Sequence, residues 1–380
     1  MYKYLWKKCL DENVIRNAWK KLRKGKTNRK DVIKIDADLD RYVGIMQESL
    51  RNTRPGEVEH PELAFVAPKH IPHIVYENGK ERVIYCPTIW EQWVHHIVVY
   101  VLAPIIMKHS YKYSCGSIPK RGSHYGKRQL ERLIKKGFRN FAKLDIRHFF
   151  NSIRLSVVID SLREIIDDEW FIYLIGVIFA HFQKGLPLGF YPSQWLANFI
   201  LRTLDQKIVD EEPVGFIRYV DDILIADDNK KKLRKILTIV KIELGRLRLK
   251  LKRNFQICKF WFVKKTGKII GRCIDFMGFV FNRTSTVLRK KIMIRSVRCA
   301  KRIGKCEKIA VGQALSMISR AGWFKHTNTR SVWEIYIKPN VNIKKLKGII
   351  SRAQRRLNRE NRVAKRKMRF TSGRIPAYCT

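Results

Sequence analysis

Acidic residues are scarce in this sequence. Its 380 residues carry 33 Asp and Glu against 79 Lys and Arg, which gives a formal net charge of +46. From residue 281 onward, 27 Lys and Arg accompany three Glu and no Asp. This excess is larger than solubility requires and indicates a polyanionic partner, first of all nucleic acid. An acidic membrane surface is the alternative, but no apolar run approaches the ~20 residues that span a bilayer.

Paired cysteines are missing as well. The eight cysteines are scattered, and none forms a C-x-x-C pair. This spacing argues against a zinc site and favours reduced thiols in a cytosolic protein. Residues 1–8 lack the apolar core of a secretory signal, so we expect an intracellular protein. The length is sufficient for a large core divided among two or three subdomains.

The most informative stretch is a pair of adjacent aspartates, Asp221 and Asp222, between two short apolar runs. Short runs of β-branched and aromatic residues predict two strands joined by a hairpin turn. Two neighbouring carboxylates at a turn repel each other and attract a divalent cation. A solvated acidic turn is the simpler explanation, because acidic turns are common.

A third aspartate favours the cation. Asp145 is the acid of another short apolar run, at 141–146. If these runs pair in one sheet, Asp145 faces Asp221 and Asp222, and the three carboxylates can hold two Mg²⁺ ions. Two such ions about 4 Å apart clamp the attacking and leaving oxygens of a phosphoryl transfer. The pattern therefore indicates nucleotide polymerisation.

Both aspartate segments resemble those of one enzyme family. Tyr219-Val220-Asp221-Asp222 resembles the catalytic box of reverse transcriptases, and residues 141–150 resemble their first aspartate motif. The resemblance implies an α+β fold, a right-hand polymerase with fingers, an antiparallel-sheet palm and a helical thumb. It implies catalytic roles for all three aspartates. The metal ligands implied for two Mg²⁺ ions, or Mn²⁺ in their place, are Asp145, Ile146, Asp221 and Asp222.

The resemblance also implies a division of the chain. The expected parts are an N-terminal helical basic extension (1–70), fingers (71–140), a palm (141–282) with a fingers insertion near 155–190, and a basic helical thumb and tail (283–380). The N-terminal extension presents either a solvated helical face or an RNA-binding surface. From about residue 82 to about residue 282 the resemblance is most specific.

The fingers are expected to contain a hairpin with an Asn78-Gly79 turn, because that dipeptide separates two short apolar runs. By resemblance, this hairpin holds the incoming deoxynucleoside triphosphate. Arg82 is the first candidate and Lys80 the second, since a guanidinium fork suits phosphate oxygens. A plain surface charge on a hairpin is the alternative.

Two further residues are assigned to the nucleotide site by resemblance. Phe150 lies five positions beyond Asp145, where the family has an aromatic ring under the sugar that excludes a 2′-OH. Core packing would also explain Phe150. Lys252 lies near the position of a family lysine that assists the pyrophosphate.

One segment departs from most reverse transcriptases. Where these enzymes have Gln-Gly, three residues, then Ser-Pro, this chain has Leu188-Gly189, three residues, then Ser193-Gln194. This form resembles the enzymes of diversity-generating retroelements, and it places Leu188, Gly189 and Gln194 in the nucleotide site. Leucine packs, whereas glutamine would hydrogen-bond the new base pair or its sugar. The loss of that bond relaxes discrimination between right and wrong pairs.

The resemblance to the enzymes of diversity-generating retroelements implies a specific function. It implies a cytoplasmic, bacterial or phage-encoded enzyme that copies a retroelement template RNA into cDNA, with errors at template adenines that diversify a target gene by mutagenic retrohoming. It also implies a pentameric accessory variability protein as partner. A retron enzyme is disfavoured, because the Asn-Ala-x-x-His and Val-Thr-Gly elements of that class are absent.

Three groups of residues are expected to contact nucleic acid. Lys120 and Arg121 lie in a Gly- and Ser-rich loop and would meet phosphate, unless the loop is a plain connector. Met277, Gly278 and Phe279 resemble the primer grip, with a core strand as the alternative. Thumb contacts with the duplex, or tail contacts with structured RNA, are expected from Arg355, Arg356, Arg359 and Arg362.

Two alternatives to the retroelement function stay open. One is a conventional group II intron-like or defence-associated reverse transcriptase, which base-specific error rates would separate from the first. The other is a non-catalytic RNA-binding scaffold, which the three intact aspartates disfavour.

Overall fold

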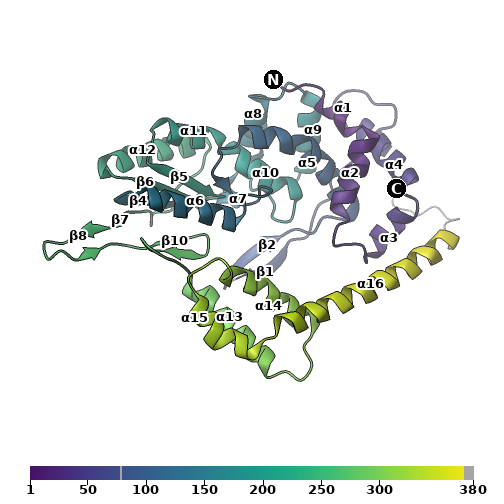
Figure 1. Cartoon of the computed structure of the whole chain (residues 1–380). Coiled ribbons are helices and arrows are strands. Elements are labelled where there is room, and N and C mark those ends of the chain that lie inside the picture. The colour runs from purple at the N-terminus through teal and green to yellow at the C-terminus, as the bar shows by residue number, and fades with distance from the viewer. Residues whose placement is uncertain (78, 372–380) are drawn as a thin grey trace.

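The computed structural model of the chain describes residues 1–77 and 79–371 (Figure 1). Asn78 of the predicted turn and the end of the basic tail lie outside the described residues. Helices gather at the N-terminal end, a five-stranded sheet lies beside them, and further helices continue into one long C-terminal helix. The N-terminal elements are α1 (Leu5–Cys9), α2 (Glu12–Leu22), α3 (Lys30–Ala37), α4 (Leu39–Arg51), η1 (Pro61–Leu63) and the hairpin β1 (His73–Glu77) and β2 (Lys80–Ile84).

The N-terminal helices pack on α5 (Ile89–His109). This helix begins with a capping box, in which Thr88 and Glu91 satisfy each other's backbone N–H groups. Trp19 of α2 packs on Trp93 of α5, with ring centroids 4.7 Å apart. Helix α5 is long and apolar enough to cross a membrane, but two thirds of its apolar window (67%) is buried inside the protein. It is therefore the central core helix, and the N-terminal extension is part of the folded body.

The main sheet has the order β3-β5-β6-β4-β7. All neighbouring pairs are antiparallel except β3 and β5, which run parallel. The sheet is therefore antiparallel, as expected, except at the short edge strand β3, which makes it mixed. A parallel edge arises because the chain enters β5 through helices rather than through a hairpin. Its strands are β3 (Ser114–Cys115), β4 (Asn140–Asp145), β5 (Gly215–Tyr219), β6 (Asp222–Asp227) and β7 (Gln256–Lys259).

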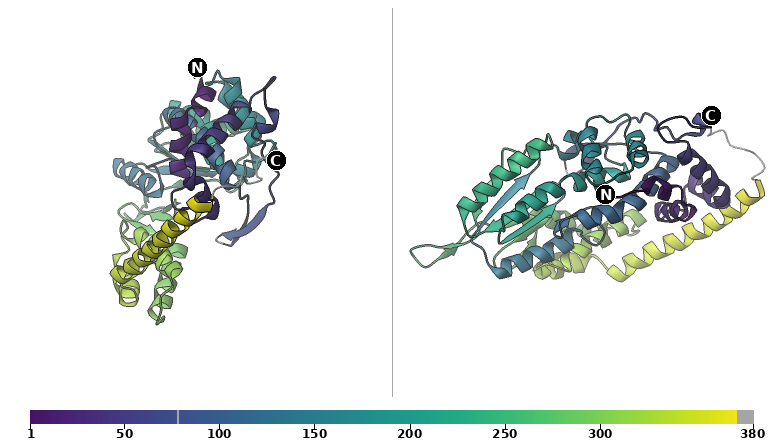
Figure 2. Two further views of the ribbon diagram at one scale, coloured as in Figure 1. Left: turned by 90° about the vertical axis from the view of Figure 1, so that its right-hand side faces the viewer. Right: turned by 90° about the horizontal axis from the view of Figure 1, so that it is seen from above.

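The sheet separates two hydrophobic cores. Alternate residues of a strand point to opposite faces. Ile223 and Ile225 of β6 join the core around α5, whereas Leu224 and Ala226 join the core that reaches the C-terminal helices. Helices α11 and α12 cover the face of the sheet away from α13 and α14 (Figures 1 and 2). The helices of this part are α6 (Ser123–Lys136), α7 (Phe149–Ser152), α8 (Leu155–Arg163), α9 (Glu169–Ile178), α10 (Tyr191–Ile200), α11 (Arg202–Asp210) and α12 (Lys230–Arg246).

Beyond the main sheet, the chain forms a protruding hairpin, a small sheet and a helical part. Helix α16 contacts α14 and, at the other end of the molecule, α3. The elements are β8 (Phe262–Val263), β9 (Ile269–Ile270), β10 (Ile274–Phe276), β11 (Phe279–Phe281), β12 (Thr286–Leu288), α13 (Lys290–Gly304), α14 (Val311–Phe324), α15 (Arg330–Val332), η2 (Trp333–Ile337), η3 (Lys338–Asn340) and α16 (Ile343–Thr371).

Candidate active site

The three predicted aspartates meet at one end of the main sheet. Asp145 is the last residue of β4 and lies opposite Asp222, the first residue of β6. Val220 and Asp221 form the turn between β5 and β6, and Val220 has a φ of 57°. This left-handed conformation is strained for a β-branched residue. The backbone N–H of Ile146 donates to the carbonyl of Asp221 at 3.3 Å, which joins the two segments.

Lys252 binds Asp145 through two contacts. Its ammonium lies 2.6 Å from Asp145 Oδ2, and its backbone N–H donates to the Asp145 carbonyl at 2.8 Å. The other carboxylate oxygen, Oδ1, is buried and receives no hydrogen bond from any described residue. A buried carboxylate oxygen without a donor is costly unless a cation or water binds it.

The carboxylates are electrostatically coupled. Burial raises the pKa of Asp222 to about 6, and the negative charges of Asp221 and Asp145 contribute to the rise. Burial also raises the pKa of Asp221, which Lys252 and Arg82 oppose. Such shifts mark a concentration of negative charge that a cation would relieve.

The donor set suits Mg²⁺, which prefers hard oxygen ligands. Carboxylates in register, with one unpartnered buried oxygen, fit that ion. Within residues 1–77 and 79–371, however, no group of three or more His, Cys, Asp or Glu side chains is already arranged to hold a metal. The ligand set of Asp145, Ile146, Asp221 and Asp222 therefore stays a prediction.

A buried ion pair supports the turn from behind, and sequence reasoning missed it. The guanidinium of Arg218 donates to both carboxylate oxygens of Asp205 at 2.7 and 2.6 Å, and both side chains are 1% exposed. Arg218 also donates to the Val220 carbonyl at 2.9 Å and to Asn198 Oδ1 at 3.0 Å. Arg218 thus holds the backbone carbonyl of Val220, the strained residue next to Asp221. The sequence did offer one indication of a buried partner, because Arg218 is a charged residue inside an otherwise apolar predicted strand.

The Gly-rich loop braces the same turn. The Val220 N–H donates to the Cys115 carbonyl at 3.0 Å. Gly116 has a φ of 83°, and a Cβ there would lie 2.6 Å from Val220 Cγ2. Arg121 uses its guanidinium on the Tyr111 carbonyl at 3.1 Å, whereas Lys120 is exposed. Arg121 thus has a structural contact, and phosphate binding by the two residues stays a prediction.

Comparison with known proteins agrees with this arrangement. Residues 68–280 match the family model described as "Reverse transcriptase (RNA-dependent DNA polymerase)". That match spans more than half of the chain. The chain belongs to the reverse transcriptase family.

A curated relative of this reverse transcriptase is the retron Ec73 reverse transcriptase of Escherichia coli. It is 29% identical over 135 residues, which are 31% of this chain and 43% of the relative. The chain thus matches less than half of that protein's length. The relative belongs to the retron class that the missing motifs had disfavoured. It favours the conventional reverse transcriptase alternative over a diversity-generating retroelement, for which the comparisons give no support.

Solved structures of telomerases also align with the chain. The apo telomerase of Candida tropicalis, truncated from its C-terminal domain, is 14% identical with a TM-score of 0.43, over 58% of this chain and 55% of that chain. The telomerase of Candida albicans with a fragment of telomeric RNA is 11% identical with a TM-score of 0.44, over 77% and 59%.

In the predicted nucleotide site of this reverse transcriptase, the end of the hairpin β1–β2 contacts the Leu188–Gly189 segment. The Tyr85 N–H, directly after β2, donates to the Leu188 carbonyl at 2.8 Å. Gly189 has a φ of 108°, and a Cβ there would collide with the Tyr85 carbonyl oxygen. The Leu186 N–H donates to the Phe150 carbonyl at 2.8 Å. Phe150 and Leu188 are half-buried, and Gln194 is exposed.

The cationic hairpin residues lie at the surface. Arg82 Nε pairs with Glu77 at 2.9 Å, and both side chains are about half exposed. Lys80 is the register partner of Glu77. The positive charge of Arg82 slightly opposes the rise that burial causes in the pKa of Asp221. Binding of a triphosphate by either residue stays a prediction.

The expected primer-grip residues are buried. Met277 and Gly278 form the turn between β10 and β11, with φ of 54° and 86°. Phe279 is fully buried, with its ring centroid 5.1 Å from that of Trp323 of α14. This packing matches the core-strand alternative for the side chains of Met277 and Phe279, and it fixes α14 against β11.

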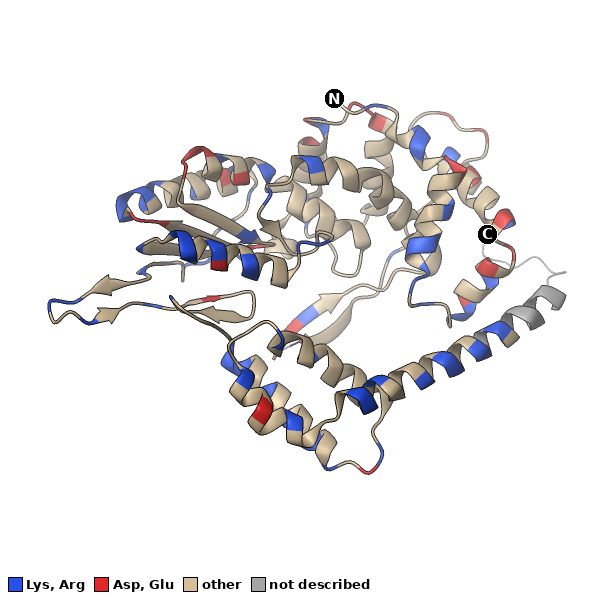
Figure 3. Cartoon of the chain, in the orientation of Figure 1, with Lys and Arg blue, Asp and Glu red and all other residues tan. Residues whose placement is uncertain are grey.

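The C-terminal arginines of the reverse transcriptase lie on α16 and are exposed. Figure 3 shows basic residues distributed along this helix. Arg356 donates to Glu360 at 2.9 Å, and the pair is largely solvent-exposed. Exposed pairs of this kind contribute little to stability, so the side chains remain available to phosphate. The other three arginines are Arg355, Arg359 and Arg362.

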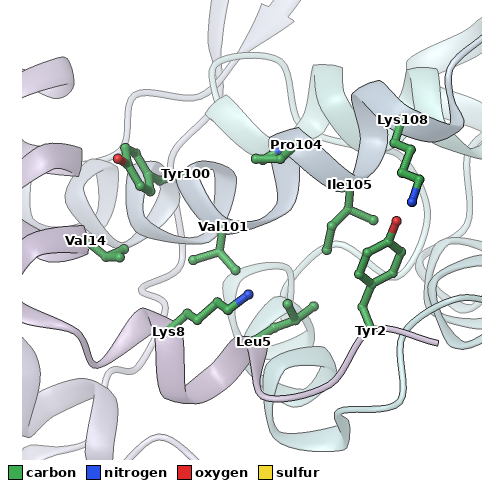
Figure 4. Close-up of a pocket in the computed structure, with 9 residues that line it drawn as sticks. All are labelled: Tyr2, Leu5, Lys8, Val14, Tyr100, Val101, Pro104, Ile105 and Lys108. Atoms are coloured by element: carbon green, nitrogen blue, oxygen red, sulfur yellow. The ribbon is translucent and has the colours of Figure 1, made fainter.

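A separate pocket lies away from the aspartates, between α1 and α5 (Figure 4). It has a volume of about 370 Å³ and mainly apolar walls. None of the site residues predicted from sequence lines it. Its lining includes Tyr2, Leu5, Lys8, Tyr100, Ile105 and Lys108.

Proposed function

We propose that this chain is an RNA-directed DNA polymerase, which joins deoxynucleoside triphosphates to a primer 3′-OH along an RNA template. The observation that carries the proposal is the pairing of Asp145 with Asp222 beside Asp221, in a member of the reverse transcriptase family. The net charge of +46 supports nucleic-acid substrates. We retain the division into an N-terminal extension, fingers, palm and thumb as part of the proposal.

The aspartates are the proposed metal ligands, with the Ile146 backbone beside them. Two Mg²⁺ ions held by these groups would activate the primer hydroxyl and neutralise charge on the leaving group. The primer hydroxyl gives its proton to water as the 3′-oxygen attacks the α-phosphorus, the bond from that phosphorus to the oxygen shared with the β-phosphate breaks, and pyrophosphate leaves. Lys252, once separated from Asp145, donates its proton to the pyrophosphate.

The remaining site residues would orient the nucleotide. Arg82, with Lys80 near it, binds triphosphate oxygens on the surface of the fingers hairpin. The Phe150 ring excludes a 2′-OH, and the Leu188–Gly189 segment packs beside the new base pair. The contact of Tyr85 with Leu188 supports this arrangement, because it couples the hairpin to that segment.

Primer extension on an RNA template with Mg²⁺ tests the proposal. We expect DNA synthesis by the wild type, loss with chelator and loss in Asp221→Asn with RNA binding retained. Asp210→Asn, an exposed acid on α11, is the matched control and should keep its activity. Equal synthesis by wild type and Asp221→Asn would refute the assignment. Binding without synthesis by the wild type would favour the RNA-binding scaffold.

The Leu188–Gly189 segment supports a second candidate, error-prone copying for a diversity-generating retroelement with an accessory protein. Product sequencing separates it from conventional copying. Errors concentrated opposite template adenine, and reduced in Leu188→Gln, would support it. A uniformly low error rate would leave the conventional, retron-like or group II intron-like enzyme.

A further inference from the structure

A basic hairpin protrudes from the palm and has no part in the site described above. We define this basic arm as residues 260–272, with β8 and β9 as its strands. Val263 and Ile269 are register partners in it, and both are exposed. Figure 1 shows the arm beyond the main sheet, at the end away from the fingers hairpin β1–β2.

The root of the basic arm is anchored. Phe260 is buried and stacks on Phe138, with ring centroids 4.9 Å apart. The Phe260 N–H donates to the Arg139 carbonyl at 2.7 Å, and the Arg272 N–H donates to Lys259 at 3.0 Å. The arm therefore leaves the palm in a defined direction.

The tip carries three exposed lysines, Lys264, Lys265 and Lys268. Its turn is closed by the Lys264 N–H, which donates to the Lys268 carbonyl at 2.9 Å. Residues 256–274 include no Asp or Glu. Among the described residues, no acidic side chain pairs with these lysines. Their charge is therefore uncompensated, as in a phosphate-binding surface.

Cations also surround the aromatic residues near the root. Lys259 Nζ lies 4.5 Å from the centre of the Phe262 ring, and the guanidinium groups of Arg139 and Arg283 lie 5.9 and 5.7 Å from Trp261. These rings are half-buried. A single strand needs exposed rings on which bases stack, whereas a charged ridge suits the phosphates of a duplex.

The position of the arm indicates which nucleic acid it would contact. The chain runs from the arm directly into β10 and β11, and their turn packs on Ile292 of α13 and Trp323 of α14. Figure 1 shows the arm extending past β10, so a duplex that runs from the β5–β6 turn along β10–β11 and these helices would reach it. We propose that the arm binds the phosphate backbone of the product RNA–DNA duplex; this inference rests on the proposed polymerase function.

The triple variant Lys264→Gln/Lys265→Gln/Lys268→Gln tests the inference in the full-length chain. Its matched control is Lys207→Gln/Lys231→Gln/Lys235→Gln, on the helices α11 and α12 that face away from α13 and α14. Binding is measured by fluorescence anisotropy on RNA templates annealed to labelled primers of increasing length, across a salt series.

We expect the arm variant to match wild type on short duplexes and to bind long duplexes more weakly. Each phosphate neutralised contributes about 0.9 to the slope of log affinity against log salt, so the slope should fall by up to about 2.7. An unchanged affinity, or an equal loss with the control variant, would overturn the inference. So would a loss confined to single-stranded or folded RNA.

Failure of the polymerase function is distinguishable from failure of this inference. If wild type binds duplex but extends no primer, the polymerase proposal fails while the length-dependent comparison still decides the arm. If wild type extends primers and the arm variant keeps its long-duplex affinity, only the arm inference fails.

Discussion

The ammonium of Lys252 lies 2.6 Å from Oδ2 of Asp145, while Oδ1 of the same carboxylate is buried without a described donor. The lysine therefore neutralises the aspartate when no other cation does so. A lysine in this position restrains Asp145 and would compete for one of its oxygens with a metal ion bound as proposed above.

Substitution Lys252→Gln should therefore have two effects. Loss of the proton donor should lower kcat by about 10²-fold, as for other general acids. Loss of the competing ammonium should lower the Mg²⁺ concentration needed for half-maximal rate. Steady-state primer extension across a Mg²⁺ titration measures both. The neighbouring exposed Lys250→Gln is the control and should alter neither.

Loss of either partner of the Arg218–Asp205 ion pair should strongly lower the free energy of unfolding. Removal of one partner leaves a buried uncompensated charge, which costs about 3–5 kcal/mol. We expect Arg218→Met and Asp205→Asn each to lower the free energy of unfolding by that amount, and the double variant to lose much less than the sum. Urea denaturation measures this double-mutant cycle. Additive losses would contradict the coupling seen in the structure.

Gly189 should tolerate no side chain. Its φ of 108° and its proximity to the Tyr85 carbonyl leave no room for a Cβ. Gly189→Ala should displace the end of the hairpin β1–β2 and lower kcat/KM for nucleotide by about 10²-fold. Gly122→Ala is the control, because no described atom lies within 4 Å of its added Cβ and its φ is negative. Comparable losses in both variants would rule out the specific role of the Tyr85 contact.

Acid should destabilise the protein through His95. Burial lowers the pKa of this histidine from 6.5 to about 3, and the neighbouring His96 and His70 contribute. The unfolded chain takes up a proton below pH 6.5 that folded His95 does not. Stability is therefore lost as pH falls, by about 3 kcal/mol between about pH 6.5 and pH 4. Urea midpoints against pH measure this loss, which should shrink in His95→Leu.

The meeting of the three aspartates was predictable because each lies at the end of a short apolar run that is typical of a strand, and pairing of such runs in one sheet brings those ends together. Asp145 and Asp222 consequently occupy facing positions. The Arg218–Asp205 pair was not predictable, since a lone arginine in a strand does not disclose a partner thirteen residues earlier. The parallel β3–β5 edge and the burial of Phe279 likewise depend on which elements pack together, and local pattern carries no such information.

Helix α16 has a mechanical consequence. Its 29 residues form one rod about 44 Å long, which contacts α14 at one end of the molecule and α3 at the other. A rod held at both ends cannot stretch. While both contacts are kept, helices α13 and α14 can therefore swing away from the main sheet only by pivoting about the contact with α3. The rate at which a long or folded template is admitted would then depend on a contact far from the aspartates.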